Sequence, residues 1–427
     1  MHKTIWFKIH WFLGITAGII LLIVGATGAI LSFEKEIMKA INSDTYYVKV
    51  IEGQDKLTTK ELLEKFQASN PKAKINSISF SLDATSSTVI NIAGEGENAR
   101  RGISKYVNPY TAEVLPDLVG KDFFGFILRL HRWLAFPQEI REVGKQTVAI
   151  STISLIVLII SALVIYWGRI KHAFFKSFTF KFKHHGRAFL STMHSAIGMW
   201  VIPLYLLASL TGLFWSYEWY NNALYKIAGV EKPQRMQQPQ QPQAQKEPKS
   251  EQQKSPEQRE RKPEGEKAEG QRERKPEGQR AERGQGQRPQ GESSSSKFAD
   301  IQKAVEMFNI FVQRDYSNVT LRFPQKGTVY SFSYLDTDPA HYRARNTLEV
   351  DINSWQLLKH ERYNDLPLNE RLMKSILPLH TGEYFGIIGQ TLMFIASALM
   401  ALFTITGFML YINRHKKKKS KIEQQKV

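Results

Sequence analysis

Four long apolar runs alternate with polar segments along the chain. They cover about residues 11–33, 147–167, 194–217 and 387–412. Each run approaches or exceeds the roughly 20 residues that a helix needs to cross the hydrocarbon core of a bilayer. The first run lacks the small-residue cleavage site of a removable signal peptide, so we interpret it as an anchor. The pattern predicts four membrane-spanning helices that contact the lipid bilayer.

Two polar segments between these runs have other periodicities. Residues 58–115 combine one helical pattern with three alternating, strand-like stretches, and residues 296–363 repeat that order. Alternation with a period of two predicts half-buried strands. We therefore expect two α/β modules of similar build outside the membrane.

Two of the apolar runs are also copies of one another. Aligning the histidines at their starts brings three pairs into register: His10 with His194, Gly14 with Gly198, and Gly28 with Gly212. Four residues complete about one helical turn and 18 about five turns, so each histidine shares a helix face with its two glycines. The sequence thus predicts a membrane α-helical fold, a four-helix transmembrane bundle from an internal duplication with two extracytoplasmic modules.

The distribution of basic residues predicts the orientation of the chain in the membrane. Loop 168–190 carries six Lys or Arg residues and no acidic residue, and the tail after Tyr411 is also basic. Basic loops stay on the cytoplasmic side, so both termini are expected there, in a cytoplasmic (inner) membrane. The net charge of +18 is explained by this topology, and we expect no nucleic acid partner.

These observations divide the chain into segments. The two modules are placed at 34–130 and 297–378, and an outer helix extension at 218–230. The other boundaries are a cytoplasmic N-terminus (1–10), TM1 (11–33), a membrane-edge segment with TM2 (131–167), the basic loop (168–190), TM3 (191–217), a Pro/Gln/Glu/Arg linker (231–296), a membrane-edge segment with TM4 (379–412) and the basic tail (413–427). The linker is too poor in apolar residues to form a core and is expected to be a disordered tether; a binding role is the alternative.

Histidine is the strongest ligand type available, because the chain has no cysteine. His10 and His194 open the outward-running helices, and His131 and His380 precede the inward-running ones. Two imidazoles at each depth would give bis-His ligation of two b haems, with the glycines making room for the flat rings. The alternative reading is that these are interfacial histidines bonded to carbonyls and that the glycines only let helices pack closely.

The arrangement resembles the PepSY-associated transmembrane family. The residues that carry the resemblance are "IHWFLGI" (9–15), "LHRWL" (130–134), "MHSAIGM" (193–199) and "LHTGEYFG" (379–386), with PepSY-like hairpins "YVNPYTAEVL" and "LEVDINSWQLL". Members include iron-regulated membrane proteins and di-haem ferric-siderophore reductases. The resemblance implies haem b, two per chain, with His10, His131, His194 and His380 as axial ligands.

These inferences lead to one expected function and two alternatives. We expect a haem-dependent membrane oxidoreductase that passes electrons to an extracytoplasmic ferric siderophore or other ferric chelate in iron uptake. The donor is expected to be quinol or a separate protein, because the chain has no nucleotide-binding fingerprint. A transporter of iron chelate or metal and a non-redox PepSY scaffold or regulator are the alternatives.

No acid–base catalytic group is needed for such a reduction, so none is assigned. The residues expected to bind an anionic substrate near the outer histidines are Arg132, Arg343, Arg345 and Tyr384. Arginine favours anionic oxygen ligands through charge-assisted hydrogen bonds. Alternatively, Arg132 serves only the haem propionates.

Overall fold

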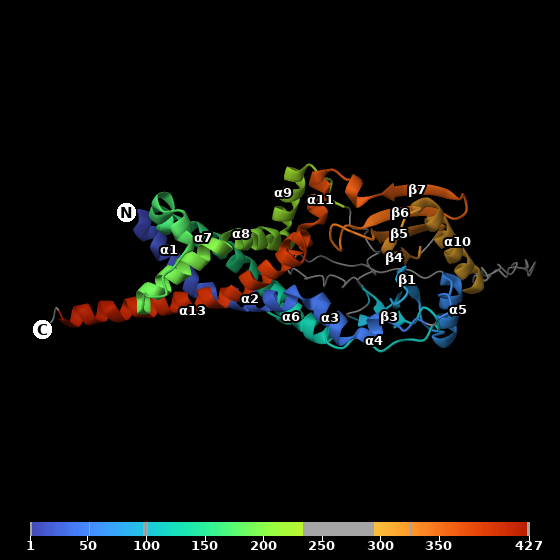
Figure 1. The fold of residues 1–427 in the computed structure, drawn as a ribbon, viewed down its shortest axis with the longest axis horizontal. Helices are drawn as coiled ribbons and strands as arrows, with labels where there is room; N and C mark the ends of the chain where they lie inside the picture. Colours follow the sequence, from blue (N-terminus) through green and yellow to red (C-terminus); the bar gives the residue numbers. More distant parts are fainter. Residues whose placement is uncertain are drawn as a thin grey trace, which may run out of the picture. The chain divides into compact units, whose positions relative to one another are not determined.

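The computed structural model describes residues 2–50, 52–96, 99, 101–233, 294–324 and 327–424 (Figure 1). Most of the predicted linker, 231–296, lies outside these described residues. The α-helices are α1 (His2–Thr16), α2 (Gly18–Ser32), α3 (Glu34–Ile41), α4 (Ser43–Tyr46), α5 (Thr59–Ser69), α6 (Lys121–Trp133), α7 (Arg141–His172), α8 (Gly186–Ser216), α9 (Glu218–Ala228), α10 (Ser294–Val312), α11 (Leu368–Lys374), α12 (Ile376–Thr381) and α13 (Gly386–Gln424). Short 3-10 turns are η2 (Gln138–Ile140), η3 (Phe175–Phe178), η4 (Tyr363–Asp365) and η5 (Glu383–Phe385).

The long apolar helices confirm a helical membrane protein. Three helical segments, Lys121–His172, Gly186–Ser216 and Glu383–Arg414, are long and apolar enough to cross a bilayer, and a fourth span results if α1 and α2 are counted together. Both chain ends lie at one end of these helices (Figure 1). We call that end the terminal side and the opposite end, which continues into the sheet, the sheet side.

The first span is bent. The axes of α1 and α2 differ by 60° at a break around Ala17. Thr16 contributes to this break, because its hydroxyl donates to the Phe12 carbonyl at 2.9 Å, and such back-bonding bends helices. In α8, Pro203 lies inside a helix that continues without a break from Gly186 to Ser216.

Helix α2 packs closely on α13 through small residues. A Cβ atom added to Gly25 would lie 2.5 Å from Met400 Cβ and 2.8 Å from the Ser397 carbonyl oxygen. A Cβ at Gly18 would lie 3.6 Å from the Thr404 methyl group. Missing side chains thus let these two helices approach, as membrane helices commonly do.

The seven strands form one antiparallel sheet in the order β3-β2-β1-β4-β5-β6-β7. They are β1 (Ile75–Phe80), β2 (Thr88–Ile92), β3 (Ile103–Val107), β4 (Tyr316–Arg322), β5 (Val329–Asp336), β6 (Asn346–Asp351) and β7 (Gln356–Glu361). The three strands of the first predicted module join the four of the second where β1 pairs with β4, with Ile78 opposite Leu321. The segments that the sequence divides into two modules therefore share a single sheet.

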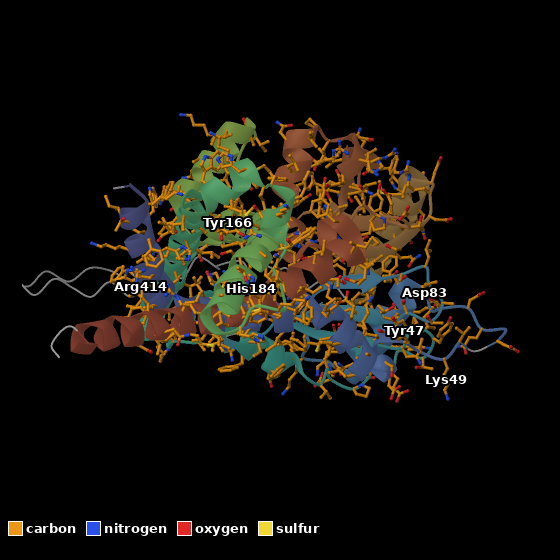
Figure 2. All side chains as sticks on the ribbon, turned by 60° about the vertical axis from the view of Figure 1, so that its left-hand side comes forward. Tyr47, Lys49, Asp83, Tyr166, His184 and Arg414 are labelled. Atoms are coloured by element: carbon orange, nitrogen blue, oxygen red, sulfur yellow. The ribbon has the colours of Figure 1, made fainter. Side chains whose placement is uncertain are left out.

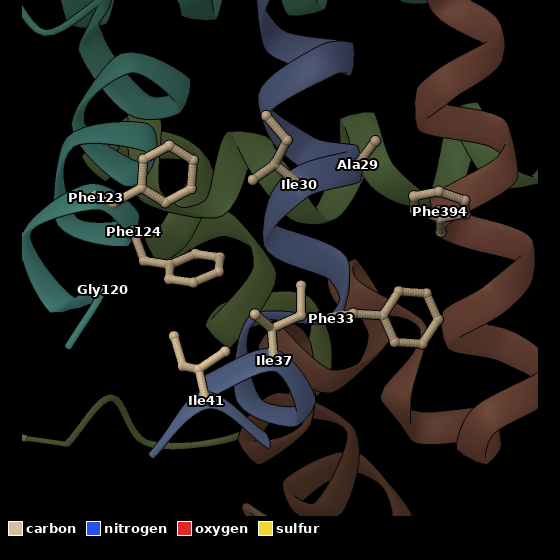
Figure 3. A pocket seen from close by; sticks show the side chains of 9 residues that line it. All are labelled: Ala29, Ile30, Phe33, Ile37, Ile41, Gly120, Phe123, Phe124 and Phe394. Carbon is tan, nitrogen blue, oxygen red and sulfur yellow. The ribbon is translucent and has the colours of Figure 1, made fainter. Parts of the chain in front are cut away.

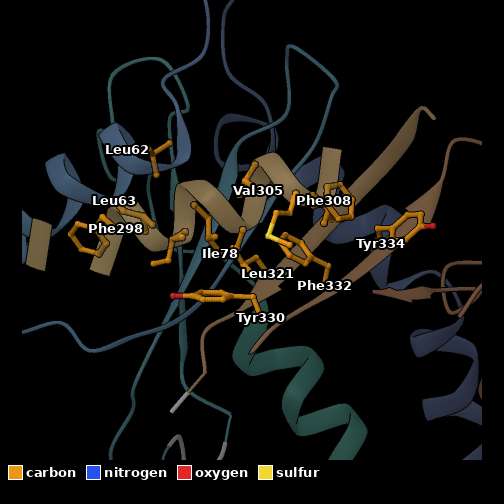
Figure 4. Close-up of a cluster of buried hydrophobic side chains, with 14 of the residues drawn as sticks. Leu62, Leu63, Ile78, Phe298, Val305, Phe308, Leu321, Tyr330, Phe332 and Tyr334 are labelled. Atoms are coloured by element: carbon orange, nitrogen blue, oxygen red, sulfur yellow. The ribbon is translucent and has the colours of Figure 1, made fainter. Parts of the chain in front are cut away.

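One apolar core also serves both segments (Figure 4). Leu63 and Phe66 of α5, Ile78 of β1, and Phe308 of α10 are among its residues, each at most 1% exposed. Phe308 stacks on Phe332 of β5, with ring centroids 4.7 Å apart. The period-two alternation in the strands and the helical period in α5 and α10 direct these side chains inward.

Candidate cofactor site between paired histidines

The structure brings the four histidines together as two pairs. The rings of His10 on α1 and His194 on α8 contact one another, with centroids 6.4 Å apart and planes at 79°. His131 on α6 and His380 on α12 form an equivalent contact at 6.3 Å and 67°. The first pair belongs to the terminal side of the helices and the second to the sheet side. These are the pairs that the sequence analysis grouped by depth.

Each histidine of the sheet-side pair is held by a threonine of the repeated helices. His131 Nδ1 lies 3.0 Å from Thr27 Oγ1 and 3.0 Å from the Val24 carbonyl oxygen. His380 Nδ1 lies 3.0 Å from Thr211 Oγ1 and 3.1 Å from the Ala208 carbonyl oxygen. A carbonyl can only accept a hydrogen bond, so Nδ1 carries the proton in both rings.

The terminal-side pair is held by hydroxyl groups of the other two helices. His10 Nδ1 lies 2.8 Å from Ser161 Oγ on α7, and His194 Nδ1 lies 2.7 Å from Thr406 Oγ1 on α13. Ser161 donates its own proton to the Leu158 carbonyl at 2.8 Å, and Thr406 donates to the Leu402 carbonyl at 2.7 Å. Each hydroxyl therefore accepts a hydrogen bond from the imidazole, so Nδ1 is again the protonated nitrogen.

All four rings consequently keep an unprotonated Nε2. A neutral imidazole whose Nδ1–H is held by an oxygen is the form in which histidine binds metals, and the hydrogen bond fixes its orientation. Among the described residues no group of three or more His, Asp or Glu side chains could hold a metal ion. A metal in this part of the chain would thus depend on pairs of histidines, which suits an ion whose other ligands come from a cofactor.

The separation within each pair leaves space for one metal ion between the two imidazoles. Histidine nitrogens bind transition metals such as zinc at about 2 Å, and the ring centroid lies roughly 1 Å farther, so two imidazoles that share a metal have centroids no more than about 6 Å apart. The observed separations are 6.4 and 6.3 Å. The donor type, its protonation and its spacing therefore fit a b-type haem at both levels.

The predicted glycines lie beside the rings. A Cβ at Gly28 would lie 3.3 Å from His131 Cε1, and one at Gly212 would lie 3.3 Å from His380 Cε1. Gly14 and Gly198 line a cavity of about 660 Å³ together with His10 and His194. This volume is in the range of small-molecule and cofactor sites. Gly28 and Gly212 thus give space to the imidazole rings of the sheet-side pair, while Gly14 and Gly198 border open space beside the terminal-side pair.

An apolar cluster lies between the two pairs along the helices. It contains Ala17, Leu21, Ile159, Val201, Tyr205, Ala396 and Met400, each at most 8% exposed. Phe403 contacts the ring of His194 at 5.1 Å and the ring of Tyr205 at 5.9 Å between centroids. Several of these residues, such as Leu21 and Met400, also line the cavity beside His10 and His194, so the inner wall of that cavity is apolar.

The residues predicted to bind an anionic substrate are in different environments. Arg345 bonds Ser333, Asn318 and Thr320 on the sheet, so its donors are already engaged. Arg343 is exposed and stacks over Tyr342 at 5.6 Å from the ring centroid; no ion pair of Arg343 occurs within the described ranges. Arg132 is exposed and lies 5.4 Å from the Trp133 ring.

Tyr384 belongs to a buried polar cluster that joins the sheet to the histidine-bearing helix α12. His341, which is 5% exposed, lies 5.6 Å from the Tyr384 ring and 2.8 Å from Ser375 Oγ, at the start of α12. Its Nδ1 accepts the Arg343 backbone N–H at 3.1 Å. Burial and the charges of Arg343 and Lys35 lower the pKa of His341 to about 4. This cluster was not predicted from the sequence.

A second hollow has no polar chemistry. It has a volume of about 380 Å³ and lies among α2, α3, α6 and α13 (Figure 3). Its lining consists of Ala29, Ile30, Phe33, Ile37, Ile41, Gly120, Phe123, Phe124 and Phe394. We assign it no role in binding a cofactor, because its lining offers neither ligands nor charges.

Sequence reasoning missed the hydroxyl groups that orient the histidines. Thr27 and Thr211 precede the repeated glycines, so their recurrence was a usable signal. Ser161 and Thr406 carry no such signal, because hydroxyl residues recur in both of their apolar runs.

The fold and site together define a membrane protein with two levels of paired, metal-competent histidines and a β-sheet beside its helices. A family model described as the PepSY-associated TM region matches residues 7–414. The chain belongs to this family, as its motifs indicated. No curated protein matches the chain.

Proposed function

We propose that this chain is a di-haem b electron-transfer protein of the cytoplasmic membrane that reduces an extracytoplasmic ferric chelate, such as a ferric siderophore. The observation that carries the proposal is the state of the four histidines: in each pair, both Nδ1 atoms bond an oxygen atom. Both Nε2 atoms are then free to bind one metal between them.

The proposed architecture is a four-helix bundle that arose by duplication. In this view α1 and α2 form one bent span equivalent to α8, while α6 with α7 corresponds to α12 with α13. The repeated contacts support it: Thr27 holds His131 as Thr211 holds His380, both at 3.0 Å. We place the terminal side in the cytoplasm, because the basic loop and tail belong to it.

The chain's own residues would perform three tasks. His10 with His194, and His131 with His380, would hold the two haems, which supply one-electron chemistry between Fe(III) and Fe(II). The apolar cluster around Leu21 would keep water and ions out of the space between them. The acceptor would take its electron at the sheet-side pair, and a quinol or a separate protein would supply it at the other.

Substrate binding would depend on Arg343 and the polar cluster next to it. Arg343 offers an exposed guanidinium above the Tyr342 ring, and a chelate with anionic oxygen ligands would accept its hydrogen bonds. Replacing Arg343 with Gln is expected to slow oxidation of the pre-reduced protein by ferric chelates. Arg345→Gln is the contrasting variant, because the Arg345 guanidinium is engaged within the sheet.

The visible spectrum of the purified, haem-supplied protein tests the function. We expect dithionite-reduced α and Soret bands of low-spin b haem and two haems per chain by pyridine haemochrome. His10→Ala or His194→Ala should remove only one haem, and His131→Ala or His380→Ala only the other. A colourless wild-type protein would instead favour a transporter or a scaffold.

A further inference from the structure

The cavity beside His10 and His194 has a strongly basic end. Besides the two histidines, its lining includes Lys8 of α1, Arg187 of α8 and Arg414 of α13. Three different helices thus each contribute one cation to a single hollow. The described lining residues include no Asp or Glu.

These cations have no carboxylate partners of their own. The ion pairs found across the described ranges involve neither Lys8 nor Arg187 nor Arg414. Arg414 is instead positioned by Phe7, with its guanidinium carbon 4.3 Å from the ring centroid. Stacking of this kind leaves the edge N–H donors of arginine available.

A hydroxyl group in the same cavity also lacks a partner. Tyr166 of α7 lines the hollow, and its Oη atom is buried without a hydrogen bond. Figure 2 shows Tyr166 and Arg414 on the helical part of the molecule and Asp83 on the part that carries the sheet. Leaving a buried donor unsatisfied is costly, so we expect this hydroxyl to turn toward a polar ligand when one occupies the cavity.

The basic end lies beyond the histidines, toward the terminal side. Arg187 precedes His194 by seven residues, which is two helical turns on the same face and roughly 10 Å along the axis. An occupant that reaches both groups therefore has an apolar body next to the imidazoles and negative charge at one edge. Carboxylate groups satisfy both the arginines and the tyrosine hydroxyl.

We propose that Lys8, Arg187, Arg414 and Tyr166 form a carboxylate-binding site for the acidic edge of a porphyrin held between His10 and His194. This inference rests on the proposed function and adds the groups that orient the ring. The same anionic chemistry could come from the headgroup of an acidic lipid, so the experiment separates the two sources.

The test compares two porphyrins in the full-length protein. His131→Ala is introduced so that only the terminal-side pair binds haem, and apoprotein in neutral-lipid nanodiscs is titrated with haem b or its uncharged dimethyl ester. We expect the site to prefer haem b by about 10-fold or more, since charge-assisted hydrogen bonds are lost in the ester. Lys8→Gln, Arg187→Gln and Arg414→Gln together should remove this preference, and Tyr166→Phe should reduce it.

A matched variant controls for net charge. Lys171→Gln, Lys176→Gln and Lys181→Gln remove three charges from the neighbouring loop outside the cavity lining, and should leave the preference unchanged. The proposal is overturned if the wild-type site binds haem b and its dimethyl ester equally, or if the preference for haem b remains in the triple Lys8/Arg187/Arg414 variant. Either result leaves haem binding itself intact. If the wild-type site binds neither porphyrin, both the proposed function and this inference fail.

A further titration tests whether the site binds an acidic lipid instead of a porphyrin. A lipid site would give three results: phosphatidylglycerol in the nanodiscs weakens haem binding, the triple Lys8/Arg187/Arg414 variant abolishes that effect, and haem b and its dimethyl ester bind equally. In that case the site recognises a lipid headgroup and the porphyrin assignment is wrong. If phosphatidylglycerol has no effect and the acid is preferred, the carboxylates of the porphyrin are the ligand.

Discussion

Each candidate ligand has a hydroxyl group within hydrogen-bond distance of its Nδ1 atom, which supports the protonation of that nitrogen. Thr211 accepts the Nδ1–H of His380 because its own proton is committed to the Leu207 carbonyl. Without that acceptor, the ring could rotate or carry its proton on Nε2, the nitrogen that would bind a metal.

Thr211→Val is therefore expected to weaken haem binding at the sheet-side pair by about 10- to 100-fold, as other changes around metal ligands do. Thr211→Ser should restore most of the affinity, because it keeps the hydroxyl. The measurement is haem titration of the apoprotein with the other pair blocked by His10→Ala. Equal affinities for the valine variant and the wild type would mean that the Ala208 carbonyl alone orients His380.

The buried His341 gives the sheet side of the molecule a defined response to acid. Its folded pKa, lowered to about 4 chiefly by burial, lies below the ordinary value of 6.5. Between these values the unfolded chain binds a proton that the folded chain does not, so stability falls as the pH drops. We expect the denaturation midpoint to decrease from about pH 6.5 to pH 4, and His341→Gln to flatten this decrease. The same slope in both proteins would assign the effect to carboxylates.

His10 and His194 could be grouped from the sequence because their spacing to the glycines is a property of one helix, and His131 and His380 because each precedes an apolar run. The partners Ser161 and Thr406 could not, since they come from helices far along the chain. Arg345 shows the same limit: its position in the sequence indicates a free basic group, while the sheet places Ser333 within 2.7 Å of its Nε atom.

Among the elements, the α2–α13 pair depends most on the absence of a side chain. Gly25→Ala would place a methyl group against Met400 Cβ and the Ser397 carbonyl, and the carbonyl cannot give way easily. We expect a loss of about 1–3 kcal/mol of stability, the usual cost of overpacking. Gly407→Ala on α13 is the control, because a Cβ there meets no atom within 4 Å among the described neighbours. Thermal unfolding in detergent compares the Gly25→Ala and Gly407→Ala variants. Equal unfolding midpoints would show that α2 and α13 can accommodate the added methyl group without a loss of stability.

Helices and strands could be predicted from the sequence where the pattern of apolar and polar residues lies within a single element. The apolar runs indicated α7, α8 and α13, and the alternating stretches indicated the strands. The break around Ala17 was not predicted, because the run from Trp11 to Phe33 contains no proline. A threonine back-bond among glycines is a weak local signal for such a bend.

At the scale of the whole molecule, the two segments that form the sheet share one core, because Leu63 of the first and Phe308 of the second both belong to it and are each 0% exposed. Leu63→Ala and Phe308→Ala should therefore shift one common unfolding transition, by about 2–5 kcal/mol each. Limited proteolysis of the segments that form the sheet can follow it. Two separate transitions, each sensitive to one substitution, would contradict a shared core.

Shared strand pairing also explains why the sequence suggested two modules. Each segment has its own helix and alternating strands, and nothing local states that β1 and β4 are neighbours. The register between Ile78 and Leu321 and the shared core unite them, and contacts between residues so far apart in the sequence give no periodic pattern along the chain.

The joint between β1 and β4 has a consequence for biogenesis. Ser79 and Thr320 face each other across it but are 241 positions apart. At about 5–20 residues per second, β1 waits roughly 10–50 s after synthesis before its partner strand emerges. During that interval an unpaired strand edge is exposed, and such edges recruit other strands. The first half of the chain is therefore the part most in need of a chaperone while the second half is still being translated and inserted.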